Sequence, residues 1–128
     1  MGLSNNKHMV ESLTKKVPKI GKGTKIFENV SISHLSEVGQ NCKISSNVKI
    51  GSWVVIGNNV MIGQGVEIKH GAFINSGTVV EKNVVVGSFA RIGTLCLIES
   101  DSVIMPGIEI DDQVKVGANS RIQYNVRI

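Results

Sequence analysis

Aromatic residues, prolines and cysteines are scarce in this chain of 128 residues, which has one Trp, one Tyr, three Phe, two Pro and two Cys. A hydrophobic core with so few rings must consist mainly of Ile and Val, and these residues favour β-strands. No apolar run reaches the roughly 18 residues of a membrane span, and no charged-then-apolar signal sequence opens the chain. We therefore expect a single cytoplasmic domain without a membrane segment.

What the chain does have is a strict sequence period of six. Every sixth residue from Ile20 to Ile128 is Ile or Val, and the residue two positions earlier is usually small or medium-sized. Three positions after each Ile or Val, Gly, Asn or Asp predominates, as at Gly23, Asn29 and Asn41. Alternating inward side chains indicate a short strand, and Gly, Asn and Asp tolerate the left-handed backbone of a tight corner. Each hexad is therefore predicted to be one strand followed by one corner.

Three such hexads close a triangular coil, and stacked coils satisfy each other's backbone groups through parallel strand pairing. Residues 20–128 thus predict an all-β, single-domain parallel β-helix of about six coils, near 29 Å long at roughly 4.8 Å per coil. The last register runs to Ile128. We expect this end to contact another copy end to end, or a further C-terminal element.

Residues 1–19 lack the repeat and are expected to form an N-terminal cap. Met9, Val10, Leu13 and Val17 have helix-like spacing, and Pro18 follows them. We expect a short helix over the N-terminal end of the coil stack, because a solenoid needs its terminal apolar surface covered.

Both cysteines are predicted to be buried and free. Cys42 and Cys96 each lie two positions before an Ile of the repeat, so both point inward. They fall in one column three coils apart, about 14 Å at roughly 4.8 Å per coil. A disulfide needs Cα atoms within about 7 Å of each other, which excludes one here.

Several large apolar residues are predicted to point outward. Those on one strand face are Met61, Val79 and Leu97, and those in a corner slot that Gly or Asn fills elsewhere are Leu35, Trp53 and Phe89. Large apolar groups at solvent corners need a partner. We expect contacts within a homotrimer or a groove for an apolar arm of a ligand, at either the Met61 face or the Trp53 corner.

The formal net charge is +4, which suits a phosphate-rich ligand such as coenzyme A or a nucleotide sugar. The C-terminal basic residues do not form one patch in a single chain, because Lys115, Arg121 and Arg127 precede three successive strands. No basic surface interleaved with aromatic residues is present, so the pattern does not predict nucleic-acid binding.

Two histidines fall at the same corner of the predicted coil. His34 and His70 are two coils apart and therefore lie roughly 10 Å from each other at ~4.8 Å per coil. This separation excludes direct binding of one metal ion by both, and a third ligand is missing within reach. No metal site is predicted.

The stretch "IGSWVVIGNNVMIGQGVEI", residues 50–68, resembles the hexapeptide-repeat proteins. This resemblance, which covers residues 20–128, implies a left-handed β-helix that is usually assembled as a homotrimer. It also implies bacterial acyltransferase activity with the acyl-donor site between adjacent subunits. The γ-class carbonic anhydrases share this fold, but the close-spaced pair of zinc-binding histidines that marks them is missing here.

Residues 74–93, "INSGTVVEKNVVVGSFARIG", resemble more closely the bacterial sialic-acid and bacillosamine type sugar O- and N-acetyltransferases. Asn75, Gly77 and Glu81 match that pattern. Lys82 and Arg91 stand where the two functional histidines of that family are found. A lysine at an exposed corner is protonated at neutral pH and is a poor base unless it is strongly desolvated.

The resemblance predicts acetyl transfer from acetyl-CoA to an amino or hydroxyl group of a sugar or nucleotide sugar. This reaction needs a general base that titrates near neutral pH and backbone N–H groups that meet the thioester oxygen. The candidate catalytic residues are His70, Asn75 and Glu81. The candidate residues for binding acetyl-CoA are Gly77, Gly87, Phe89, Arg91 and Lys115.

A non-catalytic scaffold is the alternative, in the manner of the small pointed-end dynactin subunits, which share the fold of the acyltransferases. The replacement of both functional histidines and the missing substrate-binding subdomain favour this alternative. In that case His70 is a solvated corner residue and the homotrimer binds protein partners.

Overall fold

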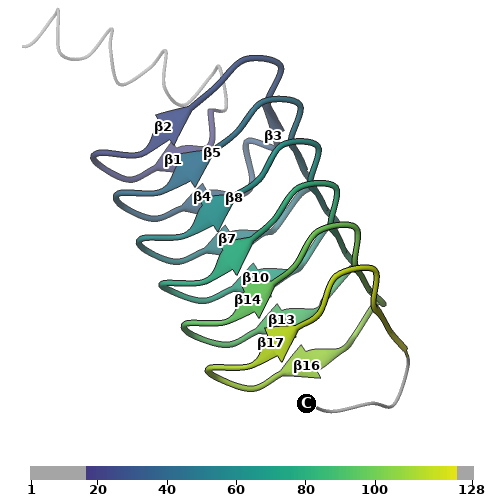
Figure 1. Ribbon diagram of the computed structural model, residues 1–128. Coiled ribbons are helices and arrows are strands. Elements are labelled where there is room, and N and C mark those ends of the chain that lie inside the picture. The colour runs from purple at the N-terminus through teal and green to yellow at the C-terminus, as the bar shows by residue number, and fades with distance from the viewer. Residues whose placement is uncertain (1–16, 124–128) are drawn as a thin grey trace, which may run out of the picture.

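The computed structural model describes residues 17–123. Every secondary-structure element within this range is a two-residue strand, eighteen in all, and the strands wind into a stack of coils with a triangular outline (Figure 1). The predicted all-β parallel solenoid of about six coils is confirmed. The predicted N-terminal helix lies outside the described residues apart from its last positions, as does the register after residue 123. No helix able to span a membrane occurs in the described range.

Three parallel six-stranded sheets form the sides of the triangle. The first sheet consists of β1 (Lys19–Ile20), β4 (Glu37–Val38), β7 (Val55–Ile56), β10 (Phe73–Ile74), β13 (Arg91–Ile92) and β16 (Glu109–Ile110). The second sheet consists of β2 (Lys25–Ile26), β5 (Lys43–Ile44), β8 (Met61–Ile62), β11 (Val79–Val80), β14 (Leu97–Ile98) and β17 (Lys115–Val116). The third sheet consists of β3 (Ser31–Ile32), β6 (Lys49–Ile50), β9 (Glu67–Ile68), β12 (Val85–Val86), β15 (Val103–Ile104) and β18 (Arg121–Ile122).

Residues eighteen apart face each other in adjacent coils, as the period predicts. Met61, Val79 and Leu97 are paired across β8, β11 and β14, so the apolar column predicted on this strand face is confirmed. Lys115 continues that column, whereas Arg121 lies on β18 of the third sheet. These two basic side chains therefore leave the stack on different sides.

Corners join the sheets, and we number each corner by the sheet that precedes it. The first corner follows the first sheet, as at residues 75–77, the second follows the second sheet, as at 81–83, and the third leads back to the first sheet, as at 69–71. The last residue of nearly every described corner has a positive φ, including the non-glycine residues Trp53 (61°) and Phe89 (60°). This conformation lets its N–H donate to the preceding coil, as Phe89 N does to the carbonyl of His70 at 3.1 Å.

Leu35 is the exception among the described corners. Its φ is not positive, and its N–H donates to the hydroxyl of Ser33 at 3.2 Å. Leu35 therefore lies in the same corner column as Trp53 and Phe89, as predicted, but it does not share their left-handed backbone conformation.

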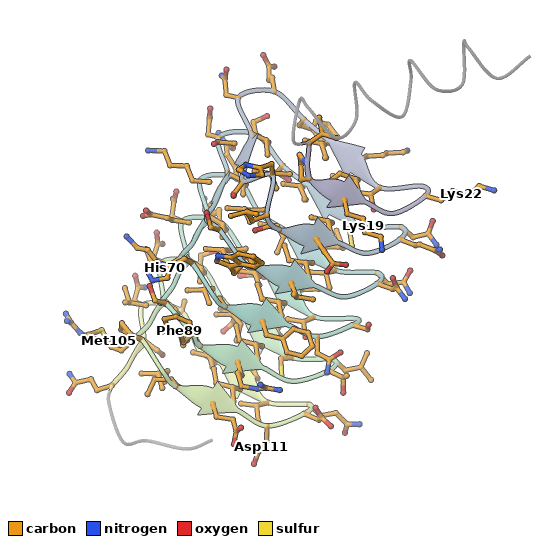
Figure 2. The ribbon with its side chains drawn as sticks, turned by 180° about the vertical axis from the view of Figure 1, so that it is seen from behind. Lys19, Lys22, His70, Phe89, Met105 and Asp111 are labelled. Atoms are coloured by element: carbon orange, nitrogen blue, oxygen red, sulfur yellow. The ribbon has the colours of Figure 1, made fainter. Side chains whose placement is uncertain are left out.

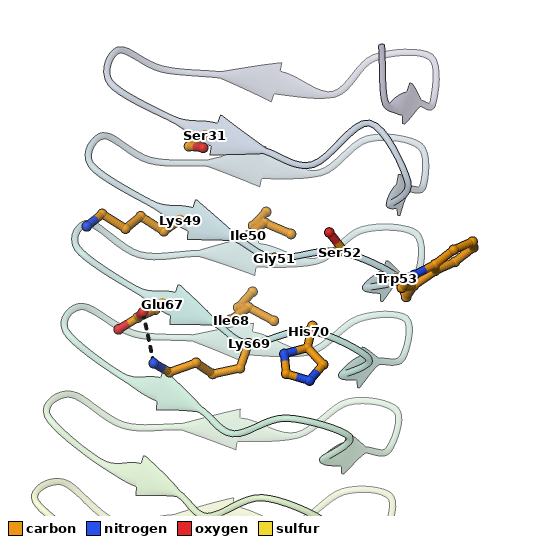
Figure 3. Close-up of a pocket in the computed structure, with 10 residues that line it drawn as sticks. All are labelled: Ser31, Lys49, Ile50, Gly51, Ser52, Trp53, Glu67, Ile68, Lys69 and His70. Atoms are coloured by element: carbon orange, nitrogen blue, oxygen red, sulfur yellow. Dashed lines mark ion pairs between the residues drawn. The ribbon is translucent and has the colours of Figure 1, made fainter. Parts of the chain in front are cut away.

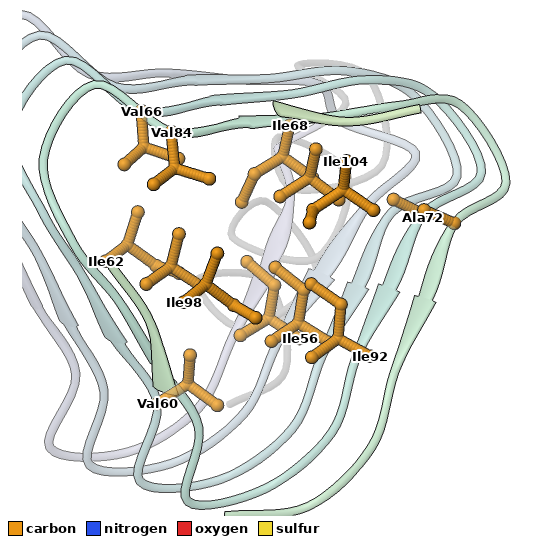
Figure 4. Packing of buried hydrophobic residues seen from close by; sticks show 14 of the residues in the cluster. Ile56, Val60, Ile62, Val66, Ile68, Ala72, Val84, Ile92, Ile98 and Ile104 are labelled. Carbon is orange, nitrogen blue, oxygen red and sulfur yellow. The ribbon is translucent and has the colours of Figure 1, made fainter. Parts of the chain in front are cut away.

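The core is a column of aliphatic side chains along the axis of the stack (Figure 4). Ile62, Ile68 and Ile74, one from each sheet, have at most 1% of their surface exposed. Each branched side chain packs against its counterpart in the next coil, so the core is continuous along the axis of the stack although it is narrow.

Polar side chains that point inward are paired with backbone groups. The Thr78 hydroxyl donates to the carbonyl of Gly93 at 2.8 Å and accepts the N–H of Cys96 at 3.1 Å. The thiols of Cys42 and Cys96 each lie 3.1 Å from a backbone carbonyl oxygen, that of Gly57 and that of Asp111. Both cysteines are buried and free, as predicted. In the described range no buried side-chain nitrogen or oxygen lacks a partner.

The substitution Ile68→Ala should remove apolar contacts with the coils on both sides. Ile68 has 1% of its surface exposed, so we expect a loss of about 2 to 5 kcal/mol in the free energy of unfolding. Urea denaturation measures this loss, and Gln64→Ala at an exposed corner is the control. Equal stability of the two variants would contradict the inward register.

Candidate active site

His70 lies at the third corner, between β9 of the third sheet and β10 of the first sheet, and its side chain is exposed. The chain passes close to the preceding coil here, because a Cβ on Gly51 would lie 2.9 Å from the backbone nitrogen of His70. Gly51 therefore permits the two coils to approach, and the backbone position of His70 is fixed on a rigid element.

Two residues of the next coil contact the imidazole. The hydroxyl of Ser88 lies 3.4 Å from Nδ1 of His70, a long hydrogen bond whose direction depends on the tautomer. The ring of Phe89 lies edge to face with the imidazole, with 5.2 Å between centroids and an interplanar angle of 86°. His70, Phe89 and Met105 lie along one edge of the stack (Figure 2). Nδ1 is thus engaged, and Nε2 has no hydrogen-bond partner among residues 17–123.

Gly71 provides the space for the Phe89 side chain. Gly71 has a φ of +75°, and a Cβ at this position would overlap Cδ1 of the Phe89 ring. The Phe89 side chain therefore lies over Gly71, toward the preceding coil, and this direction brings it against His70.

A shallow groove of about 550 Å³ runs past His70 on the third sheet (Figure 3). It is lined by Ser31, Lys49, Ile50, Gly51, Ser52, Trp53, Glu67, Ile68, Lys69 and His70. Lys69 pairs with Glu67 at 3.1 Å, and Lys49 is paired in register with Glu67 on the neighbouring strand. The groove therefore combines a net positive charge, an exposed indole and an imidazole.

The groove also borders free backbone donors. At the first corner, side chains of the next coil cap the N–H of the middle residue, as Asn58 Oδ1 does for Gln40 at 2.8 Å and Asp112 Oδ1 does for Thr94 at 2.8 Å. At the third corner, the N–H groups of Ser52 and His70 have no such cap from the described residues. Donors of this kind can stabilise an oxygen that develops negative charge.

The other two predicted catalytic residues lie at different corners. Asn75 is at the first corner, where its Oδ1 accepts the N–H of Ser76 at 2.8 Å. Glu81 is at the second corner, where its Oε1 accepts the N–H and the hydroxyl of Ser100 at 3.1 and 3.2 Å. A single chain therefore does not bring His70, Asn75 and Glu81 together.

The five residues predicted to bind acetyl-CoA are also spread around the coil. Gly87 and Phe89 share the third corner with His70, whereas Gly77 lies at the first corner, where a Cβ would lie 2.7 Å from the Leu95 side chain. Arg91 lies on the first sheet with its guanidinium 5.3 Å from the Phe73 ring centroid. Lys115 lies on the second sheet, 3.9 Å from a carboxylate oxygen of Glu99.

Two smaller hollows flank the predicted residues. Asn75 and Arg91 border one of about 310 Å³ on the first sheet, and Glu81 and Lys82 border one of about 380 Å³ on the second sheet. Within residues 17–123 no group of three or more His, Cys, Asp or Glu side chains is arranged to hold a metal ion.

Family models match most of the repeat region. The model described as bacterial transferase hexapeptide matches residues 35–70. The model described as hexapeptide repeat of succinyl-transferase matches residues 53–88 and 90–123, which is more than half of the chain. The chain belongs to the hexapeptide-repeat family. Its triangular eighteen-residue coil is accordingly the left-handed β-helix of that family.

Solved structures share this hexapeptide-repeat fold at low sequence identity. PerB from Caulobacter crescentus, in complex with CoA and GDP-perosamine, matches with a TM-score of 0.74 and 12% identity over 91% of this chain and 62% of its own. LpxA from Acinetobacter baumannii matches with a TM-score of 0.62 and 21% identity over 83% and 56%. The acetyltransferase domain of PglB from Neisseria gonorrhoeae matches with a TM-score of 0.54 and 14% identity over 94% and 60%.

This hexapeptide-repeat chain thus spans less than two thirds of each of those structures. A comparison with curated protein sequences finds no match. At these identities the likeness to solved structures establishes the fold alone.

Sequence reasoning missed Lys49, Lys69 and Ser88 around His70, and it missed the apolar Leu95 at the first corner. The period of eighteen could have found Ser88, since it follows His70 by one coil. The same register places Leu95 in a corner slot, where it has a φ of 55° and 62% of its surface exposed. No motif marks Lys49 and Lys69, because their contribution depends on the shape of the third sheet.

Glu81 joins two adjacent coils of the β-helix at the second corner through its hydrogen bonds to Ser100. Glu81→Ala removes the acceptor for two groups of Ser100, so we expect a loss of about 1 kcal/mol in the free energy of unfolding. Urea denaturation measures it, with the exposed Glu28→Ala at the same corner as the control. A loss no larger than that of the control would show that these hydrogen bonds contribute nothing to stability.

Proposed function

We propose that the chain is an acyltransferase that moves the acyl group of a CoA thioester, in the first instance acetyl-CoA, to an amine or hydroxyl. The observation that carries this proposal is the exposed imidazole of His70, which is held at Nδ1 beside a groove bordered by free backbone N–H groups. The matching family models are both described as repeats of transferases, and this supports the proposal.

The groove has the chemistry to hold a CoA thioester. Lys49 and Lys69 offer positive charge to its phosphates. Of the five residues predicted for the donor, Gly87 and Phe89 belong to this corner. Gly77 and Arg91, at the first corner and on the first sheet, would contribute only from a neighbouring copy, and Lys115, on the second sheet, lies away from this corner.

The reaction follows from the placement of His70. Nε2 takes the proton of the acceptor amine or hydroxyl while the acceptor nitrogen or oxygen attacks the thioester carbonyl carbon. The carbon–sulfur bond breaks, and the departing thiolate takes the proton back from the imidazolium. The N–H groups of Ser52 and His70 stand ready to stabilise the carbonyl oxygen as it becomes negative.

The acceptor in this proposal is an amino or hydroxyl group of a sugar or nucleotide sugar. PerB is a structure with both CoA and GDP-perosamine bound, which supports this class. The positive charge of the groove favours an acceptor that carries phosphate.

We further propose that the active form is a homotrimer assembled around the first sheet. Among residues 17–123, the three most exposed large apolar residues are Trp53 (65%), Phe89 (62%) and Leu95 (62%), and each lies at a corner that borders the first sheet. Each also has a positive φ, which costs a bulky residue about 1 kcal/mol or more. Exposed apolar side chains and a left-handed backbone at bulky residues are both unfavourable, so we expect another copy to cover this surface. Val55, 40% exposed on the first sheet, extends the apolar surface.

Threefold assembly around the first sheet would place the third corner of one copy beside the first corner of the next. His70 and Asn75 border the first sheet from its two sides, so they would approach each other across this contact. Glu81 lies at the second corner and would remain away from it. The proposed site thus contains His70 and Asn75 but not Glu81.

Two substitutions distinguish the possible trimer contacts. Trp53→Asn should lower the molar mass by light scattering from three times 13.7 kDa toward that of one chain, because Asn suits the left-handed corner but offers no apolar surface. Met61→Thr, on the second sheet, should leave the trimer intact. The reverse pattern would place the contact on the second sheet.

The second candidate function is a scaffold without catalysis. Lys82 and Arg91 stand at the positions where the resemblance places the functional histidines, and this observation favours it. Isothermal titration with acetyl-CoA separates the two candidates. Micromolar binding at one site per subunit would support acyl transfer, and no heat at millimolar ligand would favour the scaffold.

His70→Ala should abolish acyl transfer and leave the molar mass unchanged, because the side chain is exposed and the fold needs only its backbone. A thiol-release assay with acetyl-CoA and a panel of amino sugars measures the activity. His34→Ala, at the same corner two coils away, is the matched control. Undiminished turnover in His70→Ala would remove His70 from the mechanism.

A further inference from the structure

The third corner carries the same side-chain pattern twice. His34 is followed one coil later by Ser52 and Trp53, and His70 is followed one coil later by Ser88 and Phe89. In both cases the histidine and the serine are the middle residues of the corner, and the aromatic residue is the last. The chain therefore contains two equivalent histidine units, each spanning two coils.

In the described chain, the serine and the aromatic residue contact the imidazole only in the second unit. Ser88 and Phe89 both contact the His70 imidazole. In the first unit Ser52 pairs with the hydroxyl of Ser33 at 3.0 Å, and no ring contact joins Trp53 to His34 in the described chain. The units differ on both sides of the histidine. The residue before it is Ser33 in the first unit and Lys69 in the second, and the residue after it is Leu35 in the first and Gly71 in the second.

The glycine accounts for the ring contact, whereas Ser33 accounts for the different partner of the serine. Phe89 can lie over Gly71 because the position has no Cβ, and a Cβ there would overlap the ring. Leu35 presents a large side chain where Gly71 presents none, so the space over it is not open to Trp53.

We infer that Ser88 and Phe89 are positioning residues that hold the His70 imidazole in one orientation and one tautomer, and that Gly71 makes this possible. Phe89 blocks rotation of the ring on one side. The hydroxyl of Ser88 lies 3.4 Å from Nδ1, and in this inference it accepts the Nδ1 proton. That direction leaves the lone pair on Nε2, the nitrogen that the proposed function uses as the base. The catalytic meaning of the inference rests on that proposed function, whereas the structural part does not.

The backbone of Phe89 supports this role. A phenylalanine at a φ of 60° is unfavourable relative to the Asn or Gly found at most corners, and 62% of its surface is exposed. Its contact with His70 gives the residue a function that neither Asn nor Gly could supply. The contact leaves much of the ring exposed, so Phe89 remains free to meet a neighbouring copy as well.

Nuclear magnetic resonance tests the structural part without any substrate. The chain has three histidines and three phenylalanines, so selective labelling of these two types gives a simple spectrum. We expect cross-relaxation between the His70 and Phe89 rings, and long-range nitrogen correlations that show the proton on Nδ1 of neutral His70. Absence of the ring contact, or a proton mainly on Nε2, would overturn the inference.

Three variants isolate the contributions to positioning. Ser88→Ala should shift neutral His70 toward the mixture of tautomers found for a free imidazole. Phe89→Asn, which suits the left-handed corner, should remove the ring contact without straining the backbone. Gly71→Ala should displace Phe89, and its control is Gly65→Ala, where φ is +74° and the added Cβ meets Asn83 instead. A His70 spectrum changed equally by Gly71→Ala and Gly65→Ala would contradict the role of the glycine.

Activity then tests the catalytic part. In the acyl-transfer assay, Ser88→Ala should lower kcat about tenfold, in line with a misplaced base, while KM for the acceptor changes by less than twofold. The same change is expected for Phe89→Asn, measured on protein whose molar mass by light scattering equals that of the unsubstituted chain, because Phe89 also belongs to the proposed subunit contact. His34→Ala should match the unsubstituted chain in both constants. Wild-type kcat in a variant whose His70 tautomer has shifted would refute positioning for catalysis. An inactive unsubstituted chain with the expected spectrum would refute the proposed function instead, and leave the structural inference standing.

Discussion

The pairing of each coil with the next through parallel backbone hydrogen bonds is the constraint on which the rest of this molecule depends. Corners have a left-handed residue because its N–H must reach the carbonyl of the preceding coil, as Phe89 reaches His70. Inward positions are aliphatic or carry a hydroxyl or thiol that can bridge two coils, as Thr78 does. Both features follow from the same requirement that stacked backbones leave no buried polar group unpaired.

That constraint also determines which residues can cooperate. Side chains eighteen apart become neighbours, whereas side chains six apart leave the stack on different sides. His70 therefore contacts Ser88 and Phe89 and not Glu81, although Glu81 is nearer in the sequence. Residues from separate corners can share a site only when two copies of the chain meet, which is why the proposed chemistry and the proposed assembly depend on each other.

The period of six was enough to predict the strands, the three sheets, the buried cysteines and the outward apolar columns, because each follows from register alone. Register could not predict the direction in which a corner side chain leans. Phe89 leans over Gly71 because that position has no Cβ, and this contact was invisible to a search for motifs. The motif at residues 74–93 led instead to Asn75 and Glu81, which the triangular coil places at separate corners. The backbone conformation of Leu35 was missed for a similar reason, since its N–H bonds to Ser33.

The histidine unit of residues 69–89 has a further consequence for how such a chain can vary over evolution. All of its contacts lie within two consecutive coils, and each coil touches only its immediate neighbours. Insertion or deletion of eighteen residues elsewhere in the stack would change the length of the molecule while leaving the unit intact. The same histidine unit could therefore be carried by longer and shorter relatives, and its sequence signature is a spacing of eighteen residues rather than a contiguous motif.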